Sequence, residues 1–266
     1  MGSKDSVDPR TYIIPKRLEP IKNIVPVMSY KGGVGKTIIT SLLAISLNDA
    51  GYNVGLLDLD FTNPSLHIVL GVDLNNVIPK EEKGVLPPKI QGIKLMSIAY
   101  YTRGEPTPLR GEELSDIFKE ILSVTIWDNL DFLLVDLPPT LSDILLETLH
   151  HLRKKSKPII VTTTSKLSIM PTINLMKILR ELYIEALGVI LNMSREGDNL
   201  IHPIIKLLEK EHVNIIGVVH YDEELEYAIG SIERIRKLKI YKEVSQIVQQ
   251  LQLRLSSYKS SSLFIW

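Results

Sequence analysis

Short aliphatic runs alternate with longer amphipathic segments along most of the chain. The aliphatic runs cover residues 24–29, 54–58, 93–98, 132–136, 158–163, 187–192 and 215–219. They are almost continuously apolar, which is typical of strands that are buried on both faces of a parallel sheet. Helical spacing of apolar residues predicts helices between them, at 36–50, 111–124, 143–154, 169–182 and 199–212. The pattern therefore predicts an α/β fold, a doubly wound and mostly parallel sheet with helices on both faces.

Three segments depart from this rhythm. Residues 1–20 are polar and interrupted by proline, and we expect an N-terminal arm there. Residues 71–92 are rich in Pro, Lys and Glu, which predicts a long surface loop. Apolar residues recur at helical spacing from 240 to 255, which predicts a helix that covers the sheet or that meets a partner or a membrane surface. We assign residues 21–255 to a single domain and residues 256–266 to a C-terminal tail, which ends in four apolar residues.

Composition narrows the functions that this fold could serve. Lys and Arg together number 31, as do Asp and Glu, so no global charge attracts nucleic acid, which we do not expect as a partner. The chain contains no cysteine, which excludes disulfides, zinc–thiolate sites and a cysteine nucleophile. No apolar run approaches the roughly 20 residues that span a bilayer, and the first residues lack the apolar stretch of a signal peptide. We therefore expect a cytoplasmic protein without an integral membrane segment.

A glycine-rich segment follows the first predicted strand and opens the first predicted helix. It reads Lys31-Gly32-Gly33-Val34-Gly35-Lys36-Thr37. Glycines allow backbone N–H groups to converge on phosphate oxygens, and the helix N-terminus adds a positive partial charge. Lys36 would reach the β- and γ-phosphates of a nucleotide, and the Thr37 hydroxyl would coordinate Mg²⁺. The segment predicts a phosphate-binding loop whose binding residues are Gly32, Gly33, Val34, Gly35, Lys36, Thr37 and Ile38.

Polar residues end three of the other predicted strands. Asp58 and Asp60 are two residues apart on one strand and so face the same way. Asp136 ends another strand, where a carboxylate can hold a Mg²⁺-bound water, and we expect Asp58 and Asp136 to join Thr37 around the metal. Asn192 ends a third, and its amide could bind the edge of adenine, although a buried capping role is the alternative.

The strict phosphate-loop pattern would require Gly at position 30, where this chain has Tyr30. The pattern Lys-Gly-Gly-x-Gly-Lys-Thr is instead similar to the deviant P-loop of the MinD, ParA and Mrp ATPases. Over roughly residues 24–229 the chain resembles the Mrp-type ATPases most. The other features that carry this resemblance are Asp58-Leu59-Asp60 with Asn63-Pro64-Ser65, Met96-Ser97, Leu137-Pro138-Pro139, Asn192-Met193-Ser194 and residues 217–222.

The resemblance implies a P-loop NTPase that forms a homodimer bridged by ATP. In that family Lys31 would reach across the interface to the partner's ATP, and Asp60 would position the attacking water. With Lys36, these are the expected catalytic residues. Asn192 and Asp222 would lie around the adenine.

One departure from the family concerns its cargo. Mrp-type proteins typically carry a Cys-x-x-Cys after the Asn-Met-Ser segment and hold an iron–sulfur cluster between subunits. The chain has no cysteine there or elsewhere, so ligation of a cluster by thiolates is impossible. The only imidazole in residues 195–202 is that of His202, and a single histidine is more typical of a surface or capping residue than of a ligand. The family's Leu-Pro-Pro-Gly also reads Leu-Pro-Pro-Thr, with Thr140 in the place of glycine.

We therefore expect a Mg-ATP-hydrolysing switch protein of Mrp type, slow without a partner, that serves an unidentified client protein. One alternative is a positioning ATPase of the MinD or ParA kind. It would act on a nucleoprotein, or on a membrane that it contacts peripherally through its C-terminal end. Another is a nucleotide-binding scaffold with little hydrolysis.

Overall fold

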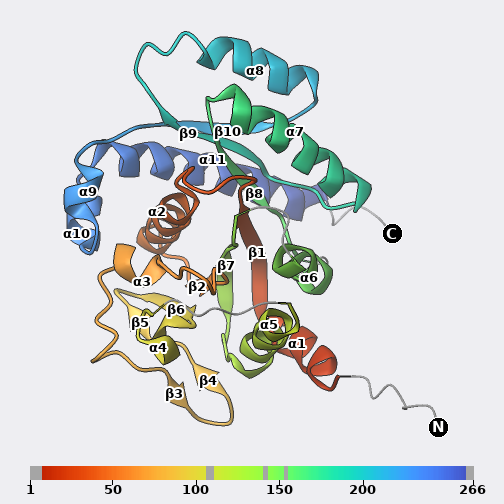
Figure 1. The fold of residues 1–266 in the computed structure, drawn as a ribbon, viewed down its shortest axis with the longest axis vertical. Coiled ribbons are helices and arrows are strands. Elements are labelled where there is room, and N and C mark those ends of the chain that lie inside the picture. The colour runs from red at the N-terminus through yellow and green to blue at the C-terminus, as the bar shows by residue number, and fades with distance from the viewer. Residues whose placement is uncertain (1–7, 106–110, 140–142, 153–154, 262–266) are drawn as a thin grey trace.

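The computed structural model describes residues 8–105, 111–139, 143–152 and 155–261, with side chains described as far as residue 251. Its main feature is an eight-stranded sheet (Figure 1). The strand order is β10 (Ile215–His220), β9 (Gly188–Ser194), β8 (Ile159–Thr163), β1 (Ile21–Met28), β7 (Leu130–Asp136), β2 (Val54–Asp58), β6 (Ile93–Ser97) and β5 (Lys89–Ile90). Neighbouring strands are parallel except at β5–β6. The predicted doubly wound fold is confirmed.

Two layers of helices cover the sheet, one on each face (Figure 1). One hydrophobic cluster packs under α1 (Arg10–Leu18), α5 (Glu112–Val124), α6 (Asp143–Leu152), α7 (Lys166–Glu181) and α8 (Ile201–Lys210). The other packs under α2 (Lys36–Asp49), α3 (Leu66–Val69), α9 (Leu225–Ala228), α10 (Ile232–Ile235) and α11 (Lys239–Ser261).

Central strands contribute to both clusters, which explains their continuous apolar sequence. In β7, Leu133 and Val135 join the cluster on one face, while Phe132 and Leu134 join the cluster on the other. Successive side chains of a strand point to opposite faces, so a strand covered on both sides has no position that favours a polar residue. Polar residues are then concentrated at the strand ends, where the site lies.

The described part of the N-terminal arm that we expected over residues 1–20 is mostly helical. Residues 10–18 form α1, which packs against α5, and Ile14 and Leu18 are buried in the core. These two apolar residues lie four apart and share one helical face, but the polar residues and Pro15 around them obscured the pattern.

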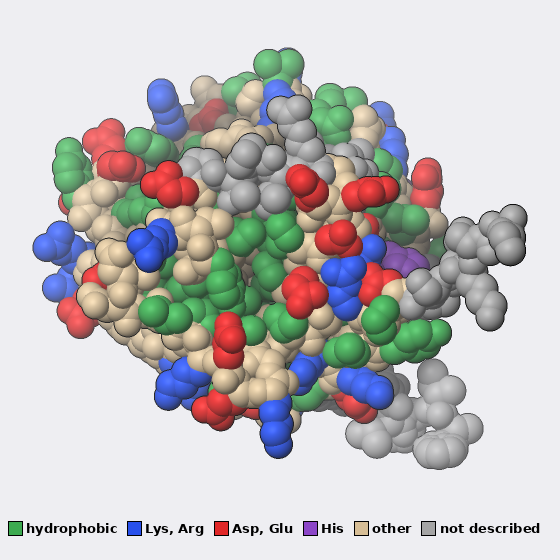
Figure 2. Space-filling model, turned by 60° about the horizontal axis from the view of Figure 1, so that its bottom comes forward, with side chains coloured by type: hydrophobic (Ala, Val, Ile, Leu, Met, Phe, Trp, Pro, Cys, Tyr) green, Lys and Arg blue, Asp and Glu red, His purple; other side chains and the backbone are tan. Residues whose placement is uncertain are grey.

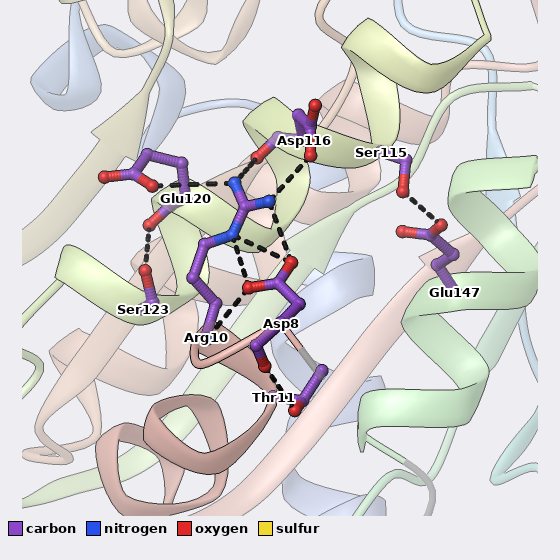
Figure 3. A network of polar contacts seen from close by, with 8 residues as sticks. All are labelled: Asp8, Arg10, Thr11, Ser115, Asp116, Glu120, Ser123 and Glu147. Carbon is purple, nitrogen blue, oxygen red and sulfur yellow. Dashed lines mark hydrogen bonds and ion pairs between the residues drawn. The ribbon is translucent and has the colours of Figure 1, made fainter. Parts of the chain in front are cut away.

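A polar network ties the start of α1 to α5 (Figure 3). The Arg10 guanidinium donates to Asp8 at 2.8 Å and to Asp116 at 2.6 Å, and it lies 3.7 Å from Glu120. Nearby, Ser115 donates to Glu147 and so joins α5 to α6. The network is partly exposed, so it fixes the position of α1 more than it adds stability.

The predicted loop at residues 71–92 contains three two-residue strands. β3 (Lys80–Glu81) and β4 (Val85–Leu86) form a hairpin, and β5 adds an antiparallel edge to the sheet. Strands this short carry too little periodicity to be seen in a sequence.

At the C-terminus, α11 covers the sheet and buries Val244, Ile247, Val248 and Leu251. The helix continues to Ser261, so the first residues of the expected tail at 256–266 belong to it, and residues 262–266 lie outside the described residues. In the part of the chain that the structure describes, no helix is both long and apolar enough to cross a membrane.

Candidate functional site

The glycine-rich loop lies at the carboxyl edge of the sheet, between β1 and α2. Gly33 and Gly35 have φ angles of +76° and +81°, a left-handed conformation that side chains other than glycine rarely adopt. Gly35 also has no room for a side chain, because an added Cβ would lie 2.3 Å from Nδ2 of Asn192. Local conformation and close packing therefore both explain glycine at position 35.

The first turn of α2 is open to a ligand. Gly35 is its N-cap and has no side chain, so no side-chain oxygen caps the turn. The first N–H groups of a helix lack partners within the helix and carry the positive end of its dipole. Together with the loop they form a cradle suited to the phosphates of a nucleotide.

A buried polar cluster lies at the start of α2. Nζ of Lys36 lies 2.7 Å from Oδ1 of Asp136, and both side chains are almost fully buried. Thr37 donates to the other oxygen of Asp136 at 2.7 Å, and Thr40 donates to Oδ1 at 2.8 Å. Asp136 thus accepts from three residues of one helix, which fixes the end of β7 against α2.

Asp58 lies beside this cluster because it is paired in register with Asp136 in the sheet. It is buried and accepts bonds from the Asp60 and Leu66 backbone N–H groups, at 3.2 and 3.4 Å, and from the Ser97 hydroxyl at 3.3 Å. Burial, and then the negative charge of Asp136, raise the pKa of Asp58, while Lys36 opposes the shift. Two close carboxylates and the Thr37 hydroxyl are the hard oxygen donors that suit Mg²⁺.

A cavity of about 270 Å³ opens above these groups. Its walls are Ser29, residues 31–38, Asp60, Asn63, Ser65 and Pro139. Asp60 is held in it by bonds from the Thr62 hydroxyl at 3.0 Å and the Asn63 backbone N–H at 3.2 Å. The half-buried Lys31 also lines the cavity, and its side chain makes no hydrogen bond or ion pair with any residue that the structure describes.

We expected both Asn192 and Asp222 to lie around the adenine, but the structure gives their two side chains different surroundings. Nδ2 of Asn192 donates to the Val34 carbonyl at 2.8 Å, while its buried Oδ1 has no partner among the described residues. That orphaned acceptor fits the amino group of adenine. Asp222 instead accepts from the backbone N–H groups of Glu224 at 3.1 Å and Ile240 at 3.2 Å. One oxygen thus binds the residue before α9 and the other binds the first turn of α11, and the contact of Asp222 with a nucleotide stays a prediction.

The structure adds residues that the sequence analysis did not assign to the site. Thr40 contacts Asp136 because it follows Lys36 by one helical turn, a spacing that could have been noticed. Ser97 meets Asp58 only through strand pairing. Ser29, Asn63, Ser65 and Pro139 line the cavity. Thr140 lies outside the described residues, and His202 is exposed on α8, as a surface residue would be.

A larger concavity of about 630 Å³ lies away from this site, between the β3–β4 hairpin and α5. Figure 2 shows hydrophobic side chains in it, with acidic side chains nearby. Most of its apolar lining is already buried, as for Val85, Met96 and Ile121. The groups that could perform chemistry are therefore at the glycine-rich loop, and not in this second hollow.

Comparison with known proteins agrees with this placement. Residues 20–214 match the sequence profile of the NUBPL iron-transfer P-loop NTPases. The chain belongs to this family. The resemblance to Mrp-type ATPases and their MinD and ParA relatives is thereby confirmed.

The chain is similar to the iron-sulfur cluster carrier protein of Rickettsia conorii, to which it is 37% identical over 179 residues. That match covers 66% of this chain and 55% of the relative. The iron-sulfur cluster carrier protein of Methanococcus maripaludis is 37% identical over 194 residues, 72% of this chain and 67% of the relative. The chain thus spans between half and two thirds of the length of these relatives.

Solved structures give the same picture of the fold. The nucleotide-binding protein of Archaeoglobus fulgidus, in complex with ADP, superposes with a TM-score of 0.72 at 26% identity, over 88% of this chain and 96% of that one. MinD of Pyrococcus horikoshii, complexed with Mg-ADP, gives a TM-score of 0.65 at 21% identity, over 86% and 95%. At that identity the MinD comparison supports the fold alone.

Proposed function

We propose that the chain is a magnesium-dependent ATPase, converting ATP to ADP and phosphate, that works as a dimeric switch for a client protein. The observation that carries this proposal is the cluster of Lys36, Thr37 and Asp136 beneath an open glycine loop. The orphaned oxygen of Asn192 next to that loop supports a base as well as phosphates in the ligand.

Each residue would act from its observed position. Thr37 and Asp136, with Asp58 behind them, would hold Mg²⁺, which neutralises phosphate charge when it is bound. Lys36 would leave Asp136 and bind the β- and γ-phosphates. Asp60, which also lines the cavity, would orient the attacking water. Because Lys36 must exchange one charged partner for another, we expect slow turnover without a partner protein.

The surface around the loop supports dimerisation through this edge of the sheet. Leu146 on α6 and Leu167 and Met170 on α7 are apolar side chains that are at least half exposed. Both helices begin just after the carboxyl ends of parallel strands, the edge at which the glycine loop also lies. Exposed apolar side chains near a charged site are typical of a protein interface. Lys31, without a described partner in its own chain, would bind the ATP of the second subunit.

We expect a Lys31→Ala protein to bind ATP with affinity within a few-fold of the natural chain but to remain monomeric in Mg-ATP, because only the cross-subunit contact is removed. Sedimentation velocity with and without Mg-ATP measures the dimer, and phosphate release measures hydrolysis. Lys89→Ala, at an exposed lysine on the edge strand β5, is the control and should dimerise normally. Normal dimers and normal hydrolysis in Lys31→Ala would remove the cross-subunit role. A natural chain that stays monomeric in ATP would contradict the dimer itself.

The cargo of the named relatives does not transfer to this chain unchanged. It has no cysteine, and the described residues contain no group of three or more His, Asp or Glu side chains that could hold a metal ion. After anaerobic incubation with ferrous iron and sulfide, we expect no stoichiometric iron and no charge-transfer absorption in the desalted protein. The Methanococcus maripaludis carrier, treated in parallel, is the positive control. Retention of a stoichiometric cluster by the cysteine-free chain would show ligation that does not use thiolates.

A further inference from the structure

The hydroxyl of Ser29 is buried without a hydrogen-bond partner. Ser29 follows β1 directly and is only 1% exposed. Its Oγ makes no hydrogen bond with any residue that the structure describes. Buried polar groups are nearly always paired, so an orphaned hydroxyl at a candidate site calls for a ligand as its partner.

The position of Ser29 indicates which ligand. Ser29 is one of the residues that line the phosphate cavity, together with Lys31, Asp60 and Pro139. Ser156 provides a contrast, because it is also buried with an unpaired hydroxyl but lies near the start of β8, outside that cavity. Burial without a partner is therefore shared by both serines, and only Ser29 borders the space in which phosphates would lie.

We propose that the Ser29 hydroxyl donates a hydrogen bond to the terminal phosphate of bound ATP. This rests on the proposed function. The loop and the first turn of α2 hold the inner phosphates in such a site. Ser29 lies two residues after Val27, whose carbonyl accepts from the Leu137 N–H at 3.3 Å, so it lies beside the segment after β7. There Pro139 comes within 4.0 Å of the position that a Gly32 Cβ would take.

The chemistry of the two groups agrees with this assignment. A serine hydroxyl has one O–H to donate, and phosphate oxygens accept without competing as donors. The bond would be charge-assisted and therefore stronger than one between neutral groups. Because ADP lacks the terminal phosphate, Ser29 would distinguish the triphosphate from the diphosphate and so contribute to the nucleotide dependence of the switch.

Calorimetric titration of Ser29→Ala with a non-hydrolysable ATP analogue and with ADP, both with Mg²⁺, tests this. We expect analogue affinity to fall roughly tenfold or more, the effect of losing a hydrogen bond to a charged group, and ADP affinity to stay within about twofold. Ser156→Ala should leave both affinities unchanged. Unfolding temperatures of all three proteins show whether Ser29→Ala has simply lost its fold.

Three results would overturn the proposal. Unchanged analogue affinity would mean that the hydroxyl does not bind the nucleotide. An equal loss for the analogue and ADP would place the contact at an inner phosphate. Loss of structure in Ser29→Ala, with full analogue affinity in Ser29→Cys, would give Ser29 a role in packing only. If the natural chain binds neither nucleotide, the proposed function itself fails. If the natural chain binds the analogue and Ser29→Ala binds it equally well, only the role of Ser29 fails.

Discussion

Replacing Lys36 by Ala is expected to lower ATP affinity by roughly a hundredfold or more. The substitution removes the ammonium group that would pair with the phosphates, and truncating one member of a buried charge pair typically costs several kcal/mol. Lys36 is the cation at the start of α2, and its ammonium group lies beside both the cavity and Asp136. Among the described residues that line the cavity, Lys31 is the only other basic one, and we propose that it serves the second subunit. Hydrolysis should fall with binding, as measured by calorimetry and by phosphate release.

The same substitution should also lower the stability of the free protein. Lys36 is the only basic partner of Asp136 among the described residues, and removing it leaves two neighbouring carboxylates, Asp136 and Asp58, without a compensating charge. Breaking a buried pair from one side costs about 3–5 kcal/mol, and we expect the lower end here because Thr37 and Thr40 still donate to Asp136. Denaturant unfolding measures this change.

Lys94→Ala is the matched control for both effects. Lys94 is also a mostly buried lysine, and its Nζ lies 2.7 Å from Asp128. Asp128 comes just before β7, so this pair lies toward the opposite edge of the sheet from the glycine loop. Its loss should lower stability moderately and leave ATP affinity unchanged. ATP binding that survives in Lys36→Ala would contradict the assignment of the glycine loop as a phosphate site.

Much of the fold could be predicted because the central strands are covered on both faces. The predicted strand at 54–58 coincides with β2, and the other predicted strands of the parallel sheet differ from the observed ones by a few residues at their ends. Burial on both sides favours apolar side chains along most of each strand, and such runs are visible without structural information. The edge strand β5 could not be predicted in this way, because it has only two residues and one strand neighbour.

The residues of the site also divide into those that local motifs predict and those that only the fold brings together. Lys31, Lys36, Thr37, Asp58, Asp60 and Asp136 were predicted from local motifs, and the structure brings them together at one edge of the sheet. Ser97 and Ser29 could not be found by such means. Ser97 reaches Asp58 through the pairing of β6 with β2, across a separation of 39 residues. Ser29 is distinguished by its missing hydrogen bond, which only the three-dimensional structure shows.

The observed contacts also suggest how nucleotide could be coupled to the rest of the molecule. Asp58 is bonded at once to the Asp60 and Leu66 backbone and to Ser97, so it joins the loop after β2 to the end of β6. Asp136 joins the end of β7 to α2. A metal held by Asp58 and Asp136 would change the electrostatic field at the loops that follow β2 and β7. These two loops line the cavity through Asp60 and Pro139.

Asp136→Asn is expected to remove the magnesium dependence of nucleotide binding and to reduce hydrolysis by roughly a hundredfold or more, an effect as large as that of other transition-state electrostatic contacts. Asparagine keeps the shape and one acceptor oxygen, for either the Thr37 or the Thr40 hydroxyl, but it loses the charge that holds a metal-bound water. Affinity for ATP without Mg²⁺ should not fall, because a negative charge near the phosphates is lost as well.

Titration of ATP in Mg²⁺ and in a chelator, for the natural chain and for Asp136→Asn, measures this dependence directly. Asp131→Asn is the control: Asp131 lies on the same strand but toward its other end, where it pairs with Lys22 at 2.7 Å. Its substitution should leave the magnesium dependence intact. If Asp136→Asn still binds ATP more tightly in Mg²⁺ than in chelator, by the same factor as the natural chain, the metal is held elsewhere. Asp136 would then be a structural partner of Lys36, fixing β7 to α2, and the loss of Lys36 would remain the more damaging of the two changes.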